Sequence, residues 1–476
     1  MYTKEITYLA MACLAGFTAT GAEQSTAPQK NVLLLCIDDL RPELNSFGAT
    51  HIHSPNIDQL AAHGRSFQRH YVNAPSCGPS RYTLLTGRYG AAGNNALFLR
   101  AKKIAEHPDA VSPSMPEWFR NHGYTTVSVG KVSHHPGGRG GQSWNDDSII
   151  EMPNAWDRHV MPEGEWKTPV GAMHGLAHGN IRPKNASKFD VFEASEGPDT
   201  IYPDGLIAEA GIKQLEELAK ADEPFFLAIG LIKPHLPFGA PQNYLDLYEG
   251  VEFPPIASPS KPAGKTTWHG SGEFMKYNRW GKDPRTDEAF AMDVRRHYAA
   301  CVSYADKQVG DIVAKLKEIG ADKNTIIVLW GDHGWHLGEQ NIWGKHSLFE
   351  ESLHSPLIFV DPSAAELGGS SHAVVETLDI FPTLCELTGL KTPDFAQGVS
   401  LQSILLNPKA PGHSAIAYYG EAKTIRTDIY RLIAHKDGYT ELYDHTTSKK
   451  ETVNLAAEHP ELVSELKQLL SEALTK

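Results

Sequence analysis

The sequence feature that most limits the fold is a set of short, almost continuously apolar runs, each followed at once by polar residues. Residues 31–37, 225–231 and 325–330 are such runs. Apolar residues at successive positions are typical of strands that are buried on both faces of a parallel sheet. Stretches with helical spacing, such as 206–218 and 289–319, separate them. This alternation predicts an α/β fold in which helices sandwich a mostly parallel sheet.

The last part of the chain has a different pattern. A chain of 476 residues exceeds the usual size of a single hydrophobic core. We therefore expect a large α/β domain at 28–398 and a smaller C-terminal α+β subdomain at 399–476. The subdomain is predicted to be an antiparallel sheet with one amphipathic helix, from short strands at 416–419, 423–427, 430–435 and 440–443 and helical spacing at 461–474.

The start of the chain predicts export. Lys4 precedes an apolar run over 6–17, and the small residues Thr20-Gly21-Ala22 suit a cleavage site, so we expect a signal peptide at 1–22. The run is too short to span a bilayer, and no other segment suggests an integral membrane helix. A periplasmic or secreted protein is therefore expected. The net charge of −13 argues against nucleic acid as a partner, but it leaves room for a small anionic substrate.

Polar side chains follow several predicted strands. Because ligands of open α/β sheets bind beyond the carboxyl ends of the strands, these side chains are expected to gather at one site. Two of the groups are acidic, which favours a hard divalent cation such as Ca²⁺, although a histidine is an unusual Ca²⁺ ligand. The residues are Asp38, Asp39, Lys131, His134, His235, Asp332 and His333.

Cys77 lies in a Gly-Pro turn just before a predicted helix, within the stretch 73–88. The exposed N–H groups at the start of a helix polarise a cysteine, which suits a nucleophile or an anion site. An isolated cysteine is nevertheless more often a buried structural thiol. Likewise, Lys131 alone could be a solvated charge, and spacing does not choose between His134 and its neighbour His135. Together, cations and imidazoles around a metal describe a pocket for a tetrahedral oxyanion ester.

These residues resemble the type I sulfatase family, and within it the iduronate-2-sulfatase-like branch. The most specific part is Cys77-Gly-Pro-Ser-Arg81 followed by Leu85-Thr-Gly-Arg88, which is similar to the signature whose cysteine is oxidised to formylglycine. The resemblance covers nearly the whole chain after the signal, apart from the irregular regions 136–202 and 254–285. Its other motifs are Asp38-Asp39, Gly130–His134, Lys233–Phe238, Gly331–Glu339, Trp343–His346, Thr424–Asp428 and Glu441–Tyr443.

The resemblance implies an alkaline-phosphatase/sulfatase-like fold and a role for each matched residue. A maturation enzyme would convert Cys77 to formylglycine, and Arg81 would steady its hydroxyls. Lys131 and Lys345 would bind the sulfate oxygens, His134 would be the base that releases sulfate, and His235 would protonate the leaving alcohol, with Lys345 as a second candidate. One Ca²⁺ would be held by Asp38, Asp39, Asp332, His333 and an oxygen of the converted residue 77.

The expected activity is hydrolysis of a sulfuric ester on a sulfated carbohydrate. A phosphate or phosphonate ester hydrolase of the same fold is an alternative, as is a non-catalytic protein that binds sulfated glycans. The irregular regions 136–202 and 254–285 are expected to set substrate specificity. Their tryptophans could stack on sugars or anchor the loops. The sequence does not identify the glycan, the sulfate position, exo or endo action, or the oligomeric state.

Overall fold

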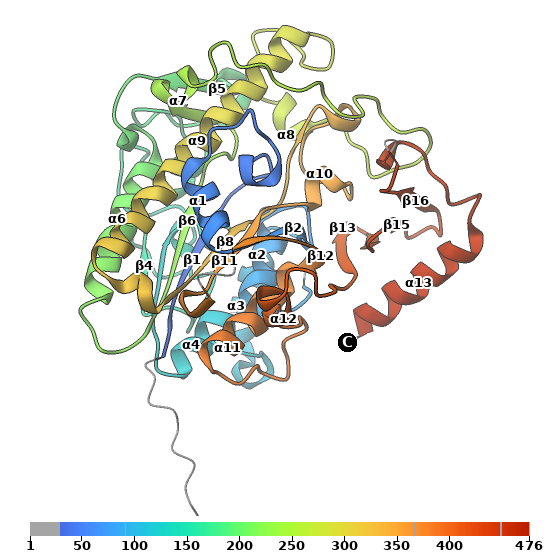
Figure 1. Ribbon diagram of the computed structural model, residues 1–476. Coiled ribbons are helices and arrows are strands. Elements are labelled where there is room, and N and C mark those ends of the chain that lie inside the picture. Colours follow the sequence, from blue (N-terminus) through green and yellow to red (C-terminus); the bar gives the residue numbers. More distant parts are fainter. Residues whose placement is uncertain (1–28, 91, 365–367, 448–449, 476) are drawn as a thin grey trace, which may run out of the picture.

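Figure 1 shows the computed structural model, which describes residues 29–90, 92–364, 368–447 and 450–475. The predicted signal peptide at 1–22 lies outside the described residues. The chain is built around one eight-stranded sheet. Its strands are β1 (Asn31–Ile37), β2 (Arg65–Tyr71), β3 (Thr125–Gly130), β4 (Arg158–Val160), β6 (Phe225–Leu231), β8 (Thr325–Gly331), β11 (Leu357–Val360) and β12 (Gly369–Glu376).

The order of the strands across the sheet is β12-β2-β11-β8-β1-β6-β3-β4. The five strands from β8 to β4 run parallel, whereas β11 is antiparallel to both of its neighbours, β8 and β2. Every residue of the central strand β1 after Asn31 is buried. This burial on both faces explains its continuous apolar run, and the predicted α/β fold with a mostly parallel sheet is confirmed.

Helices cover both faces of the sheet (Figure 1). Leu33, Leu35 and Ile37 of β1 belong to the core under one helical layer, and Val32 and Leu34 belong to the core under the other. The first layer contains α1 (Pro55–His63), α6 (Pro203–Leu218) and α9 (Glu288–Glu318). The second contains α2 (Cys77–Thr86), α4 (Met115–Asn121), α11 (Ile380–Thr388) and α12 (Gln402–Leu406).

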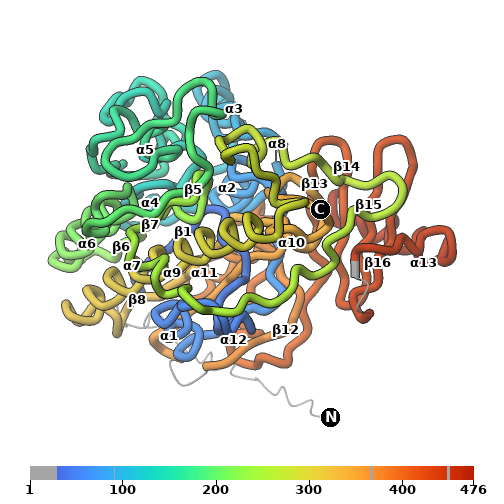
Figure 2. Tube along the Cα trace, turned by 90° about the horizontal axis from the view of Figure 1, so that it is seen from above, coloured from blue at the N-terminus to red at the C-terminus, as the bar shows by residue number. Residues whose placement is uncertain are grey.

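A second, four-stranded antiparallel sheet near the C-terminus lies on one flank of the molecule (Figure 2). The closing helix α13 (Pro460–Thr475) covers it with Val463, Leu466 and Leu470, which form a core with Ile425 and Leu432. The predicted antiparallel sheet with one helix is confirmed, whereas the boundary at 398 stays a prediction. Its strands are β13 (Ala415–Tyr419), β14 (Ala422–Arg426), β15 (Tyr430–Ala434) and β16 (Thr440–Asp444).

The two irregular regions contain only short elements between long connections. In the first, β5 (Phe192–Ser195) pairs with β7 (Phe238–Pro241) outside the main sheet. Among the described residues, none of the helices combines the length and the apolar character needed to cross a bilayer. The remaining elements are α3 (Ala96–Glu106), α5 (Pro169–Met173), α7 (Gln242–Asp246), α8 (Gly272–Met275), α10 (Glu350–Leu353), and the antiparallel pair β9 (His336–Leu337) and β10 (Trp343–Gly344).

Candidate active site

The carboxyl ends of four adjacent strands supply most of the site. Asp38 and Asp39 follow β1, Lys131 follows β3, and Asp332 follows β8, while His235 lies four residues beyond β6. A hydrogen bond connects the loops that follow β1 and β8, since the Asp332 N–H donates to the carbonyl of Ile37 over 3.1 Å. The fold thus brings these side chains together at one edge of the sheet.

Two backbone conformations at this edge are demanding. Gly130 has a φ of 71°, and a Cβ at this position would lie 2.4 Å from the carbonyl oxygen of Gly230. Only glycine fits such a close approach of two strands, so it can direct the chain from β3 into Lys131. Asp39 has a φ of 57°, an uncommon value for a residue with a side chain, and its N–H donates to Asp332 Oδ1 over 2.9 Å.

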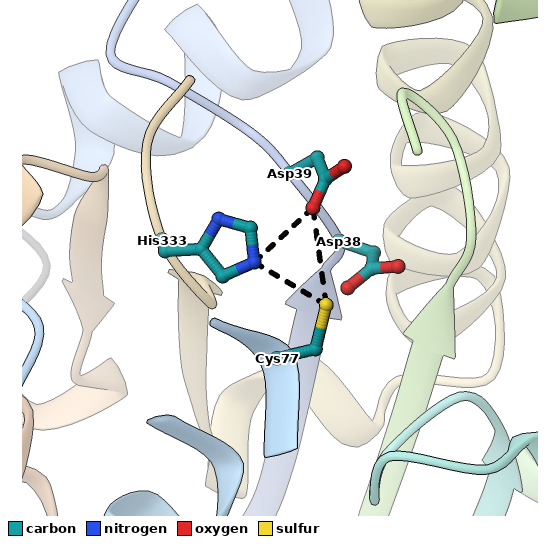
Figure 3. A group of neighbouring side chains, drawn as sticks. All are labelled: Asp38, Asp39, Cys77 and His333. Atoms are coloured by element: carbon teal, nitrogen blue, oxygen red, sulfur yellow. Dashed lines mark hydrogen bonds and ion pairs between the residues drawn. The ribbon is translucent and has the colours of Figure 1, made fainter. Parts of the chain in front are cut away.

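Cys77 is the first residue of α2, so its side chain lies at the positive end of that helix. Its Sγ is buried, 3.3 Å from His333 Nε2 and 3.9 Å from Asp39 Oδ1. Figure 3 shows these three side chains pointing toward one another, with Asp38 beside them. Burial, reinforced by the charge of Asp38, raises the pKa of the Cys77 thiol well above its ordinary value.

The donor set around Cys77 fits a divalent cation. One ligand atom from each of Asp38, Asp39, Cys77 and His333 lies within 4.8 Å of the others. Asp39 Oδ2 is buried without a hydrogen-bond partner. The His333 Nδ1–H donates to the carbonyl of Gly334 over 2.9 Å, so the lone pair of Nε2 faces the cluster. One carboxylate oxygen without a protein donor therefore lies in a group of oxygen, sulfur and imidazole ligands that a divalent cation could join.

Arg81 of α2 holds the acidic residues Asp38 and Asp332 in place. It lies one helical turn after Cys77 in α2, fully buried, and donates from Nε to Asp332 Oδ2 and from Nη2 to Asp38 Oδ1, both over 3.0 Å. Its Nη1 donates to the carbonyls of Lys131 and Val132. Although burial alone would raise the pKa of Asp38, Lys131 and Arg81 hold that pKa well below its ordinary value. The predicted action of Arg81 on residue 77 itself stays a prediction.

Two buried lysines face the same centre. Lys131 Nζ contacts Asp38 Oδ2. Lys345 Nζ lies 2.8 Å from Asp39 Oδ1 and 3.3 Å from Cys77 Sγ, with the Trp335 ring 5.5 Å away. Burial raises the pKa of Asp39 to about 7, although Lys345 acts in the opposite direction. The two ammonium groups thus flank residue 77, where an anionic group would meet them.

His235 projects from a rigid turn after β6. Its Nδ1 contacts the carbonyl of Leu236 at 2.6 Å, which leaves Nε2 without a protein partner in the described part of the chain. The turn is fixed by Asp204, a buried residue near the start of α6 that accepts from the N–H groups of Ile232 and Lys233. Lys233 Nζ then donates to the carbonyl of Pro237 over 2.6 Å. Asp204 was missed in the sequence, because an acid after a proline usually only starts a helix.

The structure separates the two adjacent histidines after β3. His135 is engaged elsewhere, because its N–H and its Nδ1 both contact the buried carboxylate of Glu151, at 2.8 and 3.2 Å. His134 Nδ1 is buried and has no hydrogen-bond partner. Burial and the nearby charge of Lys131 lower the pKa of His134 to about 2, so the ring is neutral. The contacts of the two residues thus differ, and the role of His134 as the base stays a prediction.

The irregular regions add residues that no sequence motif indicated. Glu273 Oε2 lies 3.9 Å from Lys345 Nζ, and the ring of His174 lies 5.2 Å from that of His235. Two tryptophans of these regions anchor the loops, whereas Trp280 is 48% exposed. Trp166 is buried and donates to the carbonyl of Leu176, and Trp268 donates to the carbonyl of Gln340.

Comparison with known proteins agrees with the resemblance to the sulfatase family. The family model described as sulfatase matches residues 30–390, and one described as N-sulphoglucosamine sulphohydrolase, C-terminal, matches 338–476. Human iduronate 2-sulfatase is 33% identical over 425 residues, which cover 81% of this chain and 73% of that protein. A sulfatase of Formosa agariphila is 31% identical over 461 residues, covering 91% of this chain and 84% of that protein.

Two solved structures share the fold. A phosphonate monoester hydrolase of Agrobacterium radiobacter aligns with a TM-score of 0.73 at 23% identity, covering 94% of this chain and 95% of that one. A protein in complex with its substrate D-glucosamine-2-N,6-O-disulfate aligns with a TM-score of 0.71 at 22% identity, covering 94% and 98%. The family match over residues 30–390, together with relatives above 30% identity along most of their length, is decisive. The chain belongs to the sulfatase family and is a sulfuric ester hydrolase.

Proposed function

We propose that this sulfatase removes sulfate from a sulfated carbohydrate, with Cys77 converted to formylglycine and one Ca²⁺ bound beside it. The observation that carries the proposal is the position of Cys77 at the start of α2. There Sγ lies within 3.3 Å of both Lys345 Nζ and His333 Nε2. A nucleophile at this point lies beside the Lys345 ammonium and beside the carboxylate of Asp39, whose Oδ2 has no protein donor, so that cations can stabilise a transferred anionic group.

Each neighbouring side chain has a role that follows from its surroundings. Lys131 and Lys345 neutralise the oxygens of the bound sulfate ester. His235 has a free Nε2 and is assigned to protonate the leaving alcohol, with Lys345 as a second candidate donor. Burial and the charges of Lys131 and Lys345 lower the pKa of His235, so this role requires the bound anion to favour the protonated ring. His134 is neutral and is assigned to take up a proton when sulfate is released, for which the bound anion has to raise its lowered pKa. Arg81 keeps the carboxylates of Asp38 and Asp332 in place.

The cation site would consist of Asp38, Asp39, Asp332, His333 and an oxygen on residue 77. When bound, a divalent cation supplies positive charge that lowers the pKa of a coordinated hydroxyl. A hydrated aldehyde at position 77 would offer two hydroxyls on one carbon, one to attack the sulfate ester and one whose deprotonation would release the sulfate. An ester of an ordinary serine or cysteine has no second hydroxyl and needs water to release the sulfate. The chain's own residues prepare this site: Arg81 orients the carboxylates, and the Gly334 carbonyl fixes the His333 ring.

The substrate class rests on the relatives. Human iduronate 2-sulfatase is named for a sulfated sugar acid, and a structure with the same fold contains a sulfated glucosamine as substrate. We extend this class to the present chain as a sulfated uronate or hexose. Export through a signal peptide at 1–22, maturation by a formylglycine-generating enzyme, and the division into domains at 28–398 and 399–476 belong to the same proposal.

Mass spectrometry of the peptide that contains Cys77 tests the conversion, because an aldehyde differs in mass from a thiol. Desulfation of a panel of defined sulfated oligosaccharides then tests the activity. We expect the aldehyde in the active preparation and no turnover by Cys77→Ala, whose circular dichroism should be unchanged. Full turnover by Cys77→Ala would refute the mechanism. Faster hydrolysis of aryl phosphates or phosphonates than of aryl sulfates would favour the alternative ester class.

A further inference from the structure

Two cations from the irregular regions lie at the same tyrosine. Arg182 Nη1 donates to Tyr277 Oη over 2.8 Å, and Lys276 Nζ lies 5.9 Å from the centre of the Tyr277 ring. Neither cation has a carboxylate within ion-pair distance anywhere in the part of the chain that the structure describes. Glu273 is the carboxylate that acts on Lys276, but it lies nearer to Lys345 and does not form an ion pair with Lys276. Because like charges repel each other, two cations on one ring without an ion-pair partner are a place where a ligand could supply negative charge.

Two residues, Glu273 and His174, connect this cationic pair with the site at Cys77, since Lys276 acts electrostatically on both and Arg182 on His174. Glu273 of α8 lies 3.9 Å from Lys345 Nζ, and Lys276 follows it by three residues, one turn along the same segment. On the other side, the ring of His174 lies 5.2 Å from that of His235. The pair therefore lies just outside the lysine that flanks residue 77, and not on a remote surface.

His174 is a buried polar group that feels the charges of both cationic groups. Its Nδ1 is buried without a hydrogen-bond partner. Burial lowers the pKa of His174 far below its ordinary value, helped by the positive charges of Arg182, Lys131, Lys276 and Lys345. One imidazole thus feels the cations of both groups, although the whole chain has a net charge of −13. The positive charge is concentrated locally against the overall charge of the protein.

We propose that Arg182 and Lys276 bind a second anionic group, a carboxylate or a further sulfate, on the sugar whose sulfate ester lies between Lys131 and Lys345. The inference rests on the proposed function and adds a specificity determinant to it. A guanidinium presents a planar pair of donors that matches a carboxylate or a sulfate, and Arg182 uses Nη1 alone toward Tyr277. A sugar with two anionic groups would therefore span both cationic groups, whereas a neutral sugar monosulfate would use only one.

The test compares four substrates with the matured enzyme. They are an aryl sulfate, a monosulfated hexose, the uronic acid with the same sulfate, and the same hexose with a second sulfate. The variants are Arg182→Gln and Lys276→Gln. Lys184→Gln is the matched control, because it removes one positive charge from an exposed position of the same loop. Lys276→Gln guards against misfolding, since the Lys276 side chain is exposed and forms no hydrogen bond with the described residues that its loss would break.

We expect each variant to lower kcat/KM toward the uronic acid sulfate, the disulfated hexose or both by about 10- to 100-fold. The substrate that responds identifies the second group as a carboxylate or a sulfate. Hydrolysis of the aryl sulfate and the monosulfated hexose should stay within about twofold, as should every rate of Lys184→Gln. Higher salt should narrow the preference of the wild-type enzyme.

Two results would overturn the inference while leaving the proposed function intact. One is equal wild-type kcat/KM on all three sugars with no effect of either variant. The other is an equal loss on all four substrates, which would mean that Arg182 and Lys276 only support the loops. Failure of the proposed function gives a different result, because the wild-type enzyme would then cleave the aryl sulfate and none of the sulfated sugars.

Discussion

The pair His134 and His135 offers the sharpest test of the assigned chemistry, because two neighbouring residues of the same type have opposite surroundings. His135 is bound to Glu151 through its N–H and its ring. His134 has a buried Nδ1 without a partner and lies near Lys131. We predict that His134→Gln impairs turnover, and that His135→Gln impairs stability and leaves turnover nearly intact.

The sizes of the two effects follow from these contacts. Loss of a general base slows a reaction by about 10²- to 10⁴-fold. The Glu151 carboxylate is 0% exposed. In His135→Gln it loses the contact with the His135 ring at 3.2 Å, but it keeps the hydrogen bond from the backbone N–H of residue 135 at 2.8 Å. Leaving one buried acceptor without a partner costs about 1–3 kcal/mol. The free energy of unfolding should fall by that amount, and kcat should change by no more than about threefold.

The assay follows the release of the alcohol and of sulfate separately with an aryl sulfate. Because His134 is assigned to the release of sulfate, His134→Gln should show a burst of one alcohol per active site, followed by slow turnover. Denaturant unfolding of both variants gives the stability change. The assignment is refuted if His135→Gln loses turnover while His134→Gln keeps it, or if His134→Gln slows both releases equally without a burst.

Three further predictions concern stability and the cation. Glu350→Gln should lower the free energy of unfolding by about 3–5 kcal/mol, because it leaves the buried Arg426 without the carboxylate that lies 3.3 Å away, whereas Arg431 keeps its ion pair with Glu451 at 2.6 Å. Glu421→Gln, at an exposed ion pair, should change the free energy of unfolding by less than about 1 kcal/mol in denaturant unfolding. Although burial opposes it, Asp379 at 2.8 Å raises the pKa of His413 from 6.5 to about 10. The stabilisation of the fold by the His413–Asp379 pair is therefore complete below pH 6.5 and is lost as the pH rises through about 10. The melting temperatures of wild type and His413→Gln should converge over that range, and a difference that stays constant with pH would contradict this. Chelation with EGTA should lower both the melting temperature and turnover, with Ca²⁺ restoring both, and activity that survives exhaustive chelation would exclude a required cation.

The sequence predicted the interior of the fold better than its edges. The central strands β1, β6 and β8 have continuous apolar runs because helices cover both of their faces. Strand β2 was missed because it contains Arg65 and His70, which are buried only through partners far away in the sequence. Arg65 Nη2 donates to the carbonyl of Leu405, and His70 Nδ1 contacts the carbonyl of Ser355. Local patterns contain no information on such pairing.

The same distinction holds for the site. Residues at strand ends could be gathered from the topology alone, as Asp38, Lys131 and Asp332 were. The residues that position them could not, because their partners become neighbours only in the folded chain. Glu151, which occupies His135, and Asp204, which fixes the turn before His235, lie in stretches without a motif. The basic residues Arg182 and Lys276 belong to two separate irregular regions that meet at Tyr277.

The charges around residue 77 also suggest what the site discriminates. The site has three carboxylates and three cationic groups, so the net charge of these six groups is zero when all are ionised. They are Asp38, Asp39, Asp332, Arg81, Lys131 and Lys345. A divalent cation would add two positive charges, which one ionised hydroxyl on residue 77 and one monoanionic ester would neutralise. A sulfate ester is such a monoanion, whereas a phosphate monoester has a charge of about −1.5 to −2 at neutral pH.

A phosphonate monoester carries the same single charge as a sulfate ester. If the charge of the ester selects the substrate, and not whether the central atom is sulfur or phosphorus, the enzyme should hydrolyse an aryl phosphonate monoester at a measurable rate. It should hydrolyse the matching aryl phosphate far more slowly. Equal rates on phosphate and phosphonate would show that the balance of charge does not control selection at this site.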